Sequence, residues 1–427
     1  MISADCVVAG CRQVLTCRGP LPKRREALRD LGLVEKGWIA SDRGRIVFVG
    51  TENEFRHGVE TAAGAQWIDG GGLVAMPGFV DAHTHLPFAG DRQQEFSLRL
   101  QGATYQQLAA KGMGIQTTVQ ATRAASREEL RAICLRRLDD MLLTGTTTAE
   151  AKSGYGLNLD AEIKQLEVLR DLALLHPVDV VPTFMGAHEV PPEYSGRRRE
   201  YVEFLIRTLI PEVKQRGLAE FFDVFCEAGV FSVEETAALL RAARDAGFKL
   251  KVHADEFSPL GGAQLAASLG AVSAEHLIAV SDEGIRRLAA SDTAAVLLPG
   301  VSFFLMTEKR APARRLINEG AVVVLATDFN PGSSHLSSML FALQLGVFTL
   351  RMGVEEAINA CTANAACAID RRHEVGSLEP DKKMDLLLLD VSDYLSLAYR
   401  LGPNPIRWVL KNGKAVVKDG RRTGVAA

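Results

Sequence analysis

Two histidines separated by one residue, His83 and His85, are the first side chains of this sequence that could do chemistry. They end an apolar run, residues 77–85, that has the character of a β-strand. Alternate residues of a strand project to one face, so both imidazoles can bind one metal ion. Three distant segments offer further groups where other apolar runs end, namely His253, His276 and Asp328.

The predicted metal site consists of three imidazoles and one carboxylate: His83, His85, His253 and Asp328. This donor set suits one Zn(II) or iron ion per subunit and leaves room for a water molecule. The ion is expected to lower the pKa of that water toward about 7 and to polarise a carbonyl, which favours hydrolysis of an amide-like bond. A single histidine or an aspartate after a strand often has only a structural role, so the interpretation depends on the four occurring together.

Two more groups are catalytic candidates beside the ligands. His276 is expected to polarise the substrate carbonyl or to shuttle a proton, and Asp328 to orient the water and receive its proton. Glu256 is expected to contact the water or a ring N–H, although a loop salt bridge is the alternative. The run 222–227 contains no lysine that could bridge a second metal, and Lys152 is interpreted as structural or substrate-facing.

The elements that must position these groups follow an alternating pattern typical of a parallel α/β fold. Eight apolar runs indicate strands: 78–85, 146–152, 178–187, 222–227, 248–254, 271–276, 294–299 and 321–327. Helical stretches lie between them: 126–143, 160–175, 197–216, 232–246, 261–269, 281–290 and 311–318. The pattern predicts a (β/α)8 TIM-like barrel with its active site at the carboxyl ends of the strands.

Both ends of the chain have β character. Residues 38–50 indicate a hairpin, and residues 384–390 and 408–417 indicate strands, the latter turning on Asn412-Gly413. We therefore expect a small β-sandwich domain built from residues 1–77 and 375–427, with the metal-dependent hydrolase barrel at 78–374 between them.

Composition restricts the class of protein. A net charge of −3 over 427 residues argues against nucleic-acid and anionic-membrane partners. Seven scattered cysteines, an odd number, are unlike a disulfide scaffold and favour a reducing cytoplasm. No export signal or run of about 20 apolar residues is present, so a cytoplasmic, soluble enzyme is expected.

The residues named above also carry a resemblance. The run 78–85, together with the later histidines and Asp328, resembles the amidohydrolase superfamily of metal-dependent hydrolases. Further segments are similar to the imidazolonepropionase family within it: 83–92, 152–157, 184–188, 253–257 and 327–333. The similarity covers nearly the whole chain, and its one departure, Pro87, places no assigned role in doubt.

The resemblance implies hydrolysis of the ring C–N bond of 4-imidazolone-5-propanoate to N-formimidoyl-L-glutamate, the third step of histidine degradation to glutamate. Water oriented by Asp328 and Glu256 would attack the ring carbonyl while His276 stabilises the oxyanion, and either carboxyl could protonate the leaving nitrogen. The small anionic cyclic amide would be bound by Arg92, Tyr155, His188, Glu256, Asn330, Gly332 and Ser333. Arg92 offers a planar fork for a carboxylate, and members of the family are commonly homodimers.

Two rival functions stay open at this point. Another amidohydrolase, such as a purine or pyrimidine deaminase, would use the same ligands on an exocyclic amine and would release ammonia. A barrel that only binds or stores metal is a second rival, which hydrolysis of a cyclic amide by the metal-replete protein would exclude.

Overall fold

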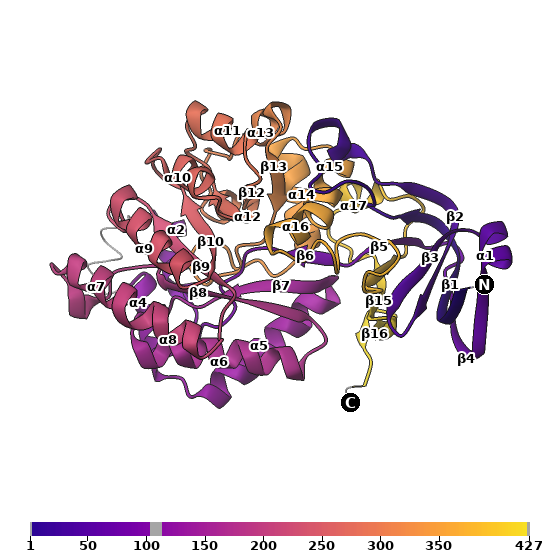
Figure 1. Cartoon of the computed structure of the whole chain (residues 1–427), viewed down its shortest axis with the longest axis horizontal. Helices are drawn as coiled ribbons and strands as arrows, with labels where there is room; N and C mark the ends of the chain where they lie inside the picture. The colour runs from indigo at the N-terminus through magenta and orange to yellow at the C-terminus, as the bar shows by residue number, and fades with distance from the viewer. Residues whose placement is uncertain (1, 103–112, 425–427) are drawn as a thin grey trace.

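The computed structural model describes residues 2–102 and 113–424, and its larger part is built around eight parallel strands (Figure 1). Neighbouring strands follow chain order, and every hydrogen-bonded pair is parallel. The strands are β6 (Phe79–Asp81), β7 (Thr146–Lys152), β8 (Asp179–Ala187), β9 (Phe221–Cys226), β10 (Lys249–Ala254), β11 (Ser273–His276), β12 (Ala294–Leu297) and β13 (Val322–Leu325). Each overlaps one of the eight apolar runs, so the predicted barrel is confirmed.

The barrel is closed at the carboxyl ends of its first and last strands. Strand β6 ends at Asp81, so His83 and His85 lie in the extended segment after it rather than within the strand. There Thr84 and Phe329 form an isolated parallel bridge. The N–H of Asp328 donates to the carbonyl of His83 at 3.1 Å, and that of His85 donates to the carbonyl of Phe329 at 2.9 Å. The closure therefore brings the first two predicted ligands next to Asp328.

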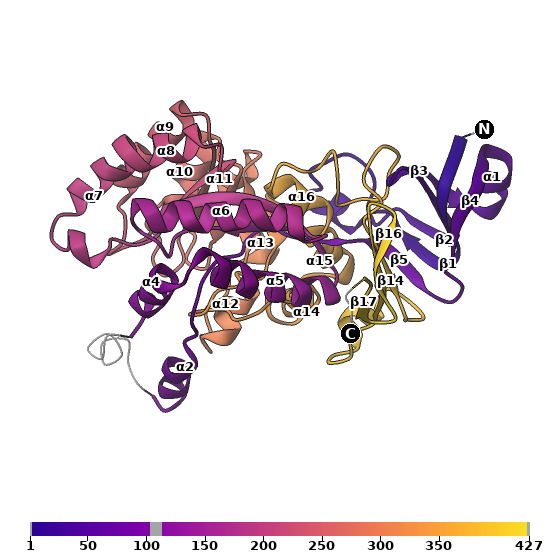
Figure 2. The ribbon, with the colours of Figure 1, turned by 90° about the horizontal axis from the view of Figure 1, so that it is seen from below.

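Helices surround the barrel and begin at the caps that the sequence indicates. Ser126 and Ser232 form capping boxes with Glu129 and Glu235, which satisfy free N–H groups of the first turn. The helices are α2 (Gln93–Leu100), α4 (Ile115–Ala124), α5 (Arg127–Leu143), α6 (Leu159–Leu175), η2 (Pro192–Tyr194), α7 (Arg198–Phe204), α8 (Ile210–Gln215), α9 (Val233–Asp245), α10 (Gly262–Leu269), α11 (Asp282–Ala289), α12 (Pro299–Phe304), α13 (Ala313–Glu319), α14 (Met339–Leu350), α15 (Val354–Ala360) and α16 (Ala363–Ala368). Figure 2 shows α5 and α6 side by side along the barrel, and α5 also contacts β15 and β17 of the smaller domain.

One predicted helix is not uniform. The stretch 197–216 contains α7 and α8 with a π-helical segment, Leu205–Leu209, between them. Pro211 lies in the first turn of α8 and has no N–H to donate to the preceding turn. The wider π spacing immediately before it fits the loss of that hydrogen bond.

The smaller domain is made from both ends of the chain, as predicted, and its strands pair in one mixed sheet (Figures 1 and 2). Its strands are β1 (Ile2–Leu15), β2 (Leu33–Asp42), β3 (Arg45–Thr51), β4 (Val59–Asp69), β5 (Val74–Pro77), β14 (Leu386–Leu389), β15 (Ile406–Lys411), β16 (Lys414–Lys418) and β17 (Arg421–Arg422). Of the helices in the terminal segments, α1 (Glu52–Gly58) packs on this sheet, while η1 (Arg25–Arg29) packs on α13 and α15 and α17 (Ser396–Tyr399) packs on α14. Strand β5, just before the barrel, pairs with β14, just after it. The division at 77/78 and 374/375 stays a prediction.

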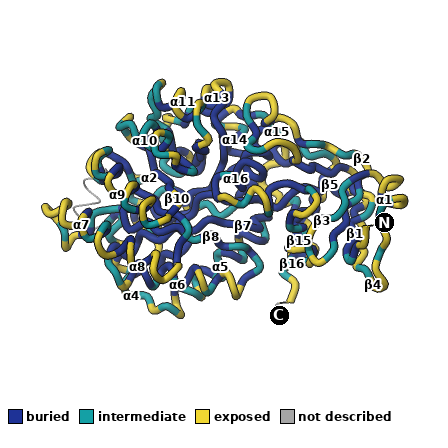
Figure 3. Tube along the Cα trace, in the orientation of Figure 1, coloured by how far each residue is buried: buried dark blue, intermediate teal, exposed yellow. Residues whose placement is uncertain are grey.

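Burial follows the architecture. The barrel strands are buried along their length, and the outer faces of the helices are exposed (Figure 3). All seven cysteines are free, and six of them are buried. In the part of the chain that the structure describes, no helix combines the length and apolar character needed to cross a membrane.

Candidate metal centre and active site

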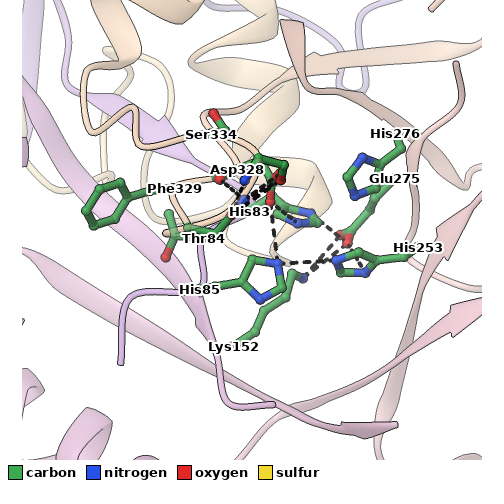
Figure 4. A network of polar contacts seen from close by, with 12 residues as sticks. His83, Thr84, His85, Lys152, His253, Glu275, His276, Asp328, Phe329 and Ser334 are labelled. Carbon is green, nitrogen blue, oxygen red and sulfur yellow. Dashed lines mark hydrogen bonds and ion pairs between the residues drawn. The ribbon is translucent and has the colours of Figure 1, made fainter. Parts of the chain in front are cut away.

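The four predicted metal ligands converge on one point at the carboxyl ends of the barrel strands (Figure 4). Nε2 of His83 lies 3.1 Å and Nε2 of His85 lies 3.4 Å from Oδ1 of Asp328. Nε2 of His253 lies 3.3 Å from Nε2 of His85. Ligands about 2.1 Å from one tetrahedral ion lie about 3.4 Å from each other. The spacing of these four atoms therefore fits a single first-row metal ion.

The chemistry of the donor atoms supports the same fit. Nε2 of His83 and Oδ1 of Asp328 are buried and make no hydrogen bond to any described residue. Burial favours a neutral acid, but the neighbouring His83 and His85 outweigh it and hold the pKa of Asp328 well below its usual range. Buried lone pairs without donors are costly unless something binds them. A bound cation would satisfy this set.

Two carboxylates that the sequence analysis did not single out lie behind the imidazoles. Oε2 of Glu275 lies 2.7 Å from Nδ1 of His83, and Oδ2 of Asp223 lies 3.1 Å from Nδ1 of His253. A carboxylate beside Nδ1 keeps the proton on that nitrogen and leaves Nε2 free to bind a metal. Their only signal in the sequence is an acidic residue inside a predicted buried strand.

Two buried lysines compensate these carboxylates. Nζ of Lys152 lies 2.7 Å from Glu150, 2.8 Å from Asp223 and 3.1 Å from Glu275. Nζ of Lys251 lies 3.0 Å from Glu275. Burial opposes the charged form of Lys152, but the three carboxylates outweigh it and raise its pKa. Lys152 is enclosed beneath the histidines and is absent from the cavity lining, so of the two interpretations the structure favours the structural one.

A cavity of about 610 Å³ opens above the ligands. All residues predicted to bind the substrate line it: Arg92, Tyr155, His188, Glu256, Asn330, Gly332 and Ser333. His276 lines it too, with Nδ1 at 3.5 Å from Oε1 of Glu256. The structure thus brings together every residue that the sequence analysis assigns to the site. The roles of these residues stay predictions.

Burial changes the protonation of three groups at the cavity wall. It lowers the pKa of His276 and of His188 to about 4, so both rings are neutral at pH 7. Burial, with the charges of Asp328 and Glu227, raises the pKa of Glu256 well above its usual range. His188 contacts the carbonyl of Gly154 through Nδ1 at 2.9 Å and stacks on His85 with a centroid distance of 4.9 Å.

The loop after Asp328 satisfies most of its own hydrogen bonds. Nδ2 of Asn330 donates to Oδ2 of Asp328 at 2.9 Å, which turns Oδ1 of that carboxylate toward the histidines. Oδ1 of Asn330 accepts the N–H groups of Gly332 and Ser333, each at 2.8 Å. In this structure the loop therefore orients the fourth ligand, in addition to the substrate contacts predicted for it.

Arg92 forms an ion pair that the sequence analysis did not predict. Its Nε and Nη2 donate to Glu95 at 2.8 and 2.5 Å, so one edge of the guanidinium is occupied, while Nη1 lies beside Gly332. Glu95 lies three positions later, at the start of α2, where such pairs meet. The pair was missed because helix α2 was not among the predicted helices.

Comparison with known proteins places the chain among metal-dependent hydrolases. The sequence model of the amidohydrolase family matches residues 74–420. Imidazolonepropionase of Symbiobacterium thermophilum is 50% identical over 422 residues, which cover 99% of each chain. Imidazolonepropionase of Geobacillus kaustophilus is 50% identical over 97% of this chain and 98% of its own. A zinc-complexed atrazine chlorohydrolase of Arthrobacter aurescens, 17% identical, shares the fold with a TM-score of 0.73 over 99% of this chain and 97% of its own.

Proposed function

The chain belongs to the amidohydrolase family and, within it, to the imidazolonepropionases, and from that premise we propose how its residues perform the reaction. It hydrolyses the ring C–N bond of 4-imidazolone-5-propanoate and yields N-formimidoyl-L-glutamate, in histidine degradation. The observation that carries the assignment of roles is the convergence of four ligand atoms on the floor of a cavity of about 610 Å³.

We propose that His83, His85, His253 and Asp328 hold one zinc or iron ion. When bound, such an ion lowers the pKa of a water molecule and polarises a carbonyl oxygen. Glu275 and Asp223 keep the Nδ1 protons of His83 and His253 in place, at 2.7 and 3.1 Å. The two carboxylates therefore present both Nε2 atoms to the same point.

Asp328 acts as the base in this proposal. Its Oδ2 is held by Asn330 at 2.9 Å, so the carboxylate keeps a fixed orientation while it takes a proton from the attacking water. The water oxygen adds to the ring carbonyl carbon. His276 is neutral and lines the cavity, so an N–H of its ring can donate to the oxygen on which negative charge develops.

Glu256 is the proton donor that the structure favours. Burial, with the charges of Asp328 and Glu227, raises the pKa of its carboxyl well above the usual range, whereas the pKa of Asp328 lies well below its usual range, so of the two carboxyls Glu256 holds a proton more readily. As the C–N bond breaks, Glu256 delivers its proton to the leaving nitrogen, and the carbonyl carbon becomes a carboxylic acid that releases its remaining proton to solvent. Proton transfer from Asp328 through solvent restores Glu256 for the next cycle.

The remaining assignments rest on the resemblance and on the cavity lining. We propose that Tyr155, His188 and the loop 330–333 surround the imidazolone ring and its propanoate tail. We also propose a cytoplasmic homodimer, which light scattering of the purified protein would test.

A ring-opening assay on metal-analysed protein tests the proposed function. Purified protein should form N-formimidoyl-L-glutamate from 4-imidazolone-5-propanoate, lose activity on chelation and regain it with one equivalent of zinc or iron. Ammonia release from purines or pyrimidines without ring opening would instead identify a deaminase. Absence of any hydrolysis by metal-replete protein would contradict both.

A further inference from the structure

A carboxylate without an assigned role in the reaction binds the segment that carries Glu256. Glu227 directly follows strand β9, is 3% exposed and lines the cavity. Its Oε2 accepts the N–H of Phe257 at 2.9 Å and that of Ser258 at 3.4 Å, and its Oε1 contacts the hydroxyl of Ser258. Strands β9 and β10 are neighbours, so an acid at the end of one strand holds the segment that follows the other.

A second buried carboxylate holds the other side of Glu256. The side chain of Asp255 accepts the N–H groups of residues 261–263, at the start of α10, at 2.9 to 3.2 Å. Glu256 therefore stands between two anchored points, one on α10 and one on Glu227. Its Oε1 lies 3.5 Å from Nδ1 of His276, so the anchored backbone places this carboxyl beside the other catalytic candidate.

Side-chain packing contributes little to the position of residues 257 and 258. The side chain of Phe257 is 57% exposed, and Ser258 is half-buried. Where little apolar surface is buried, hydrogen bonds to a fixed group decide the position of a segment. Glu227 is such a group, because it follows a buried strand and its Oε1 also accepts the N–H of Ala228 at 2.8 Å. Loss of its carboxylate would therefore release the backbone next to Glu256.

We propose that Glu227 is a positioning residue, which acts through residues 257 and 258 and keeps the carboxyl of Glu256 within reach of His276 and of the leaving nitrogen. The proposal rests on the proposed function for the role of Glu256 as the proton donor. A proton donor must lie within about 3 Å of its acceptor as the proton moves. A small displacement of Glu256 therefore slows the chemical step more than it weakens substrate binding.

A double-mutant cycle with Glu256→Gln tests whether Glu227 acts through Glu256. On the metal-loaded protein, Glu227→Ala should lower kcat about 10- to 100-fold, the cost of a misplaced catalytic group. KM should change less than about threefold, because the lost alignment matters in the transition state. In the Glu256→Gln background, the same change should lower kcat less than about twofold. Glu227→Gln should restore part of the rate, because its amide oxygen can still accept the two backbone N–H groups.

Hydrogen exchange of the same samples gives a readout that needs no substrate. Glu227→Ala should raise the exchange rates of the amides of residues 257 and 258 at least about threefold and leave those of the barrel strands unchanged. Glu189 provides the matched control, because it also lines the cavity but accepts the N–H of its own neighbour, Val190, at 2.8 Å. Glu189→Ala should leave both kcat and these exchange rates unchanged.

An equal fall in kcat with and without Glu256→Gln would show that Glu227 acts elsewhere and would overturn the proposal, as would unchanged exchange at residues 257 and 258. If Glu227→Ala does not fold, Glu227→Gln and Ser258→Ala carry the same cycle. Wild-type protein that opens no ring would contradict the proposed function. The exchange rates would then still decide whether Glu227 holds the segment, and the cycle can be run on any cyclic amide that the protein hydrolyses.

Discussion

Two networks of lysines and carboxylates lie inside this protein: a fully buried one beneath the histidines, and a partly buried one between the barrel and the small sheet. In the second, Nζ of Lys411 contacts Asp385 and lies 2.7 Å from Asp179, and Nζ of Lys383 lies 3.0 Å from Asp179. The backbone N–H of Asn412 donates to Asp385 at 3.0 Å. None of these side chains has a buried polar atom without a partner.

The network beneath the histidines, by contrast, ends in unsatisfied atoms. Lys152 and Lys251 compensate Glu275 and Asp223, but at the predicted metal site Nε2 of His83 and Oδ1 of Asp328 are buried without a hydrogen-bond partner among the described residues. The comparison teaches that buried charge alone does not identify a functional site. A better indication is a buried polar atom that has no partner beside a cavity. Folding removes such an atom from water without a compensating hydrogen bond, and a bound ligand can offset that cost.

The largest effect should come from removal of a metal ligand. His253→Ala should lower kcat/KM at least about 1000-fold, because loss of the ion removes several kcal/mol of transition-state stabilisation. Metal analysis should show a lowered metal content in the same sample. His373→Ala, an exposed histidine, is the control and should keep wild-type values. Wild-type turnover by His253→Ala after chelation would contradict the proposed metal centre.

Removal of one lysine from each network should show that only the network beneath the histidines affects metal binding. Lys152→Met and Lys411→Met each leave buried carboxylates uncompensated, so each should lower the free energy of unfolding by about 3 kcal/mol or more. Only Lys152→Met should also lower metal affinity, by about tenfold, because it alone supports the acids behind the ligands. Urea unfolding and a chelator competition assay measure the two quantities. Equal metal affinities in the two variants would mean that the network beneath the histidines does not position the ligands.

Glu275→Gln should change the metal site with a smaller effect on stability. A neutral amide is a weaker acceptor for the Nδ1 proton of His83, so metal affinity should fall about 10- to 100-fold. The matched variant Asp385→Asn, in the other network, should leave metal affinity unchanged. A Glu275→Gln protein with wild-type affinity would show that His83 needs no orienting acid.

Acid titration should reveal the smallest effect, at the domain junction. Burial opposes ionisation of Asp179, but Lys411 and Lys383 outweigh it and lower its pKa below the ordinary value of 3.8. Its contribution to stability is therefore complete above about pH 4 and is lost as the pH falls through the lowered pKa. Because the side chain is 36% exposed, solvent screening limits this contribution to about 1 kcal/mol.

Urea unfolding of wild type and Asp179→Asn measures this contribution. The free energies of unfolding should differ by about 1 kcal/mol at pH 7, and the difference should shrink below about pH 4. A difference that stays constant from pH 7 to pH 3 would assign the effect to packing rather than to charge.

Much of the fold and site could be predicted from local sequence. The apolar runs match the barrel strands because a strand enclosed on both faces must be apolar along its length. His83, His85, His253 and Asp328 could be found because parallel strands of a barrel end at one rim, where function is built. The turn at Asn412-Gly413 was visible because both residues need a positive φ, which asparagine and glycine tolerate.

Other features depended on contacts between distant segments. Glu275 and Asp223 act on imidazoles of other strands, and the strand register that brings them together is set by packing around the whole barrel. The pairing of Arg92 with Glu95 needed helix α2, whose short polar sequence shows little amphipathic pattern.

The sequence by itself thus determined which chemistry the protein can do, because residue type and strand periodicity place metal ligands at the rim of a barrel. Only the tertiary structure decided which nitrogen of each imidazole faces the predicted metal site and which residue pairs with Arg92. Those choices depend on which partner lies within about 3 Å of each buried atom, and such distances arise only when all the strands are assembled.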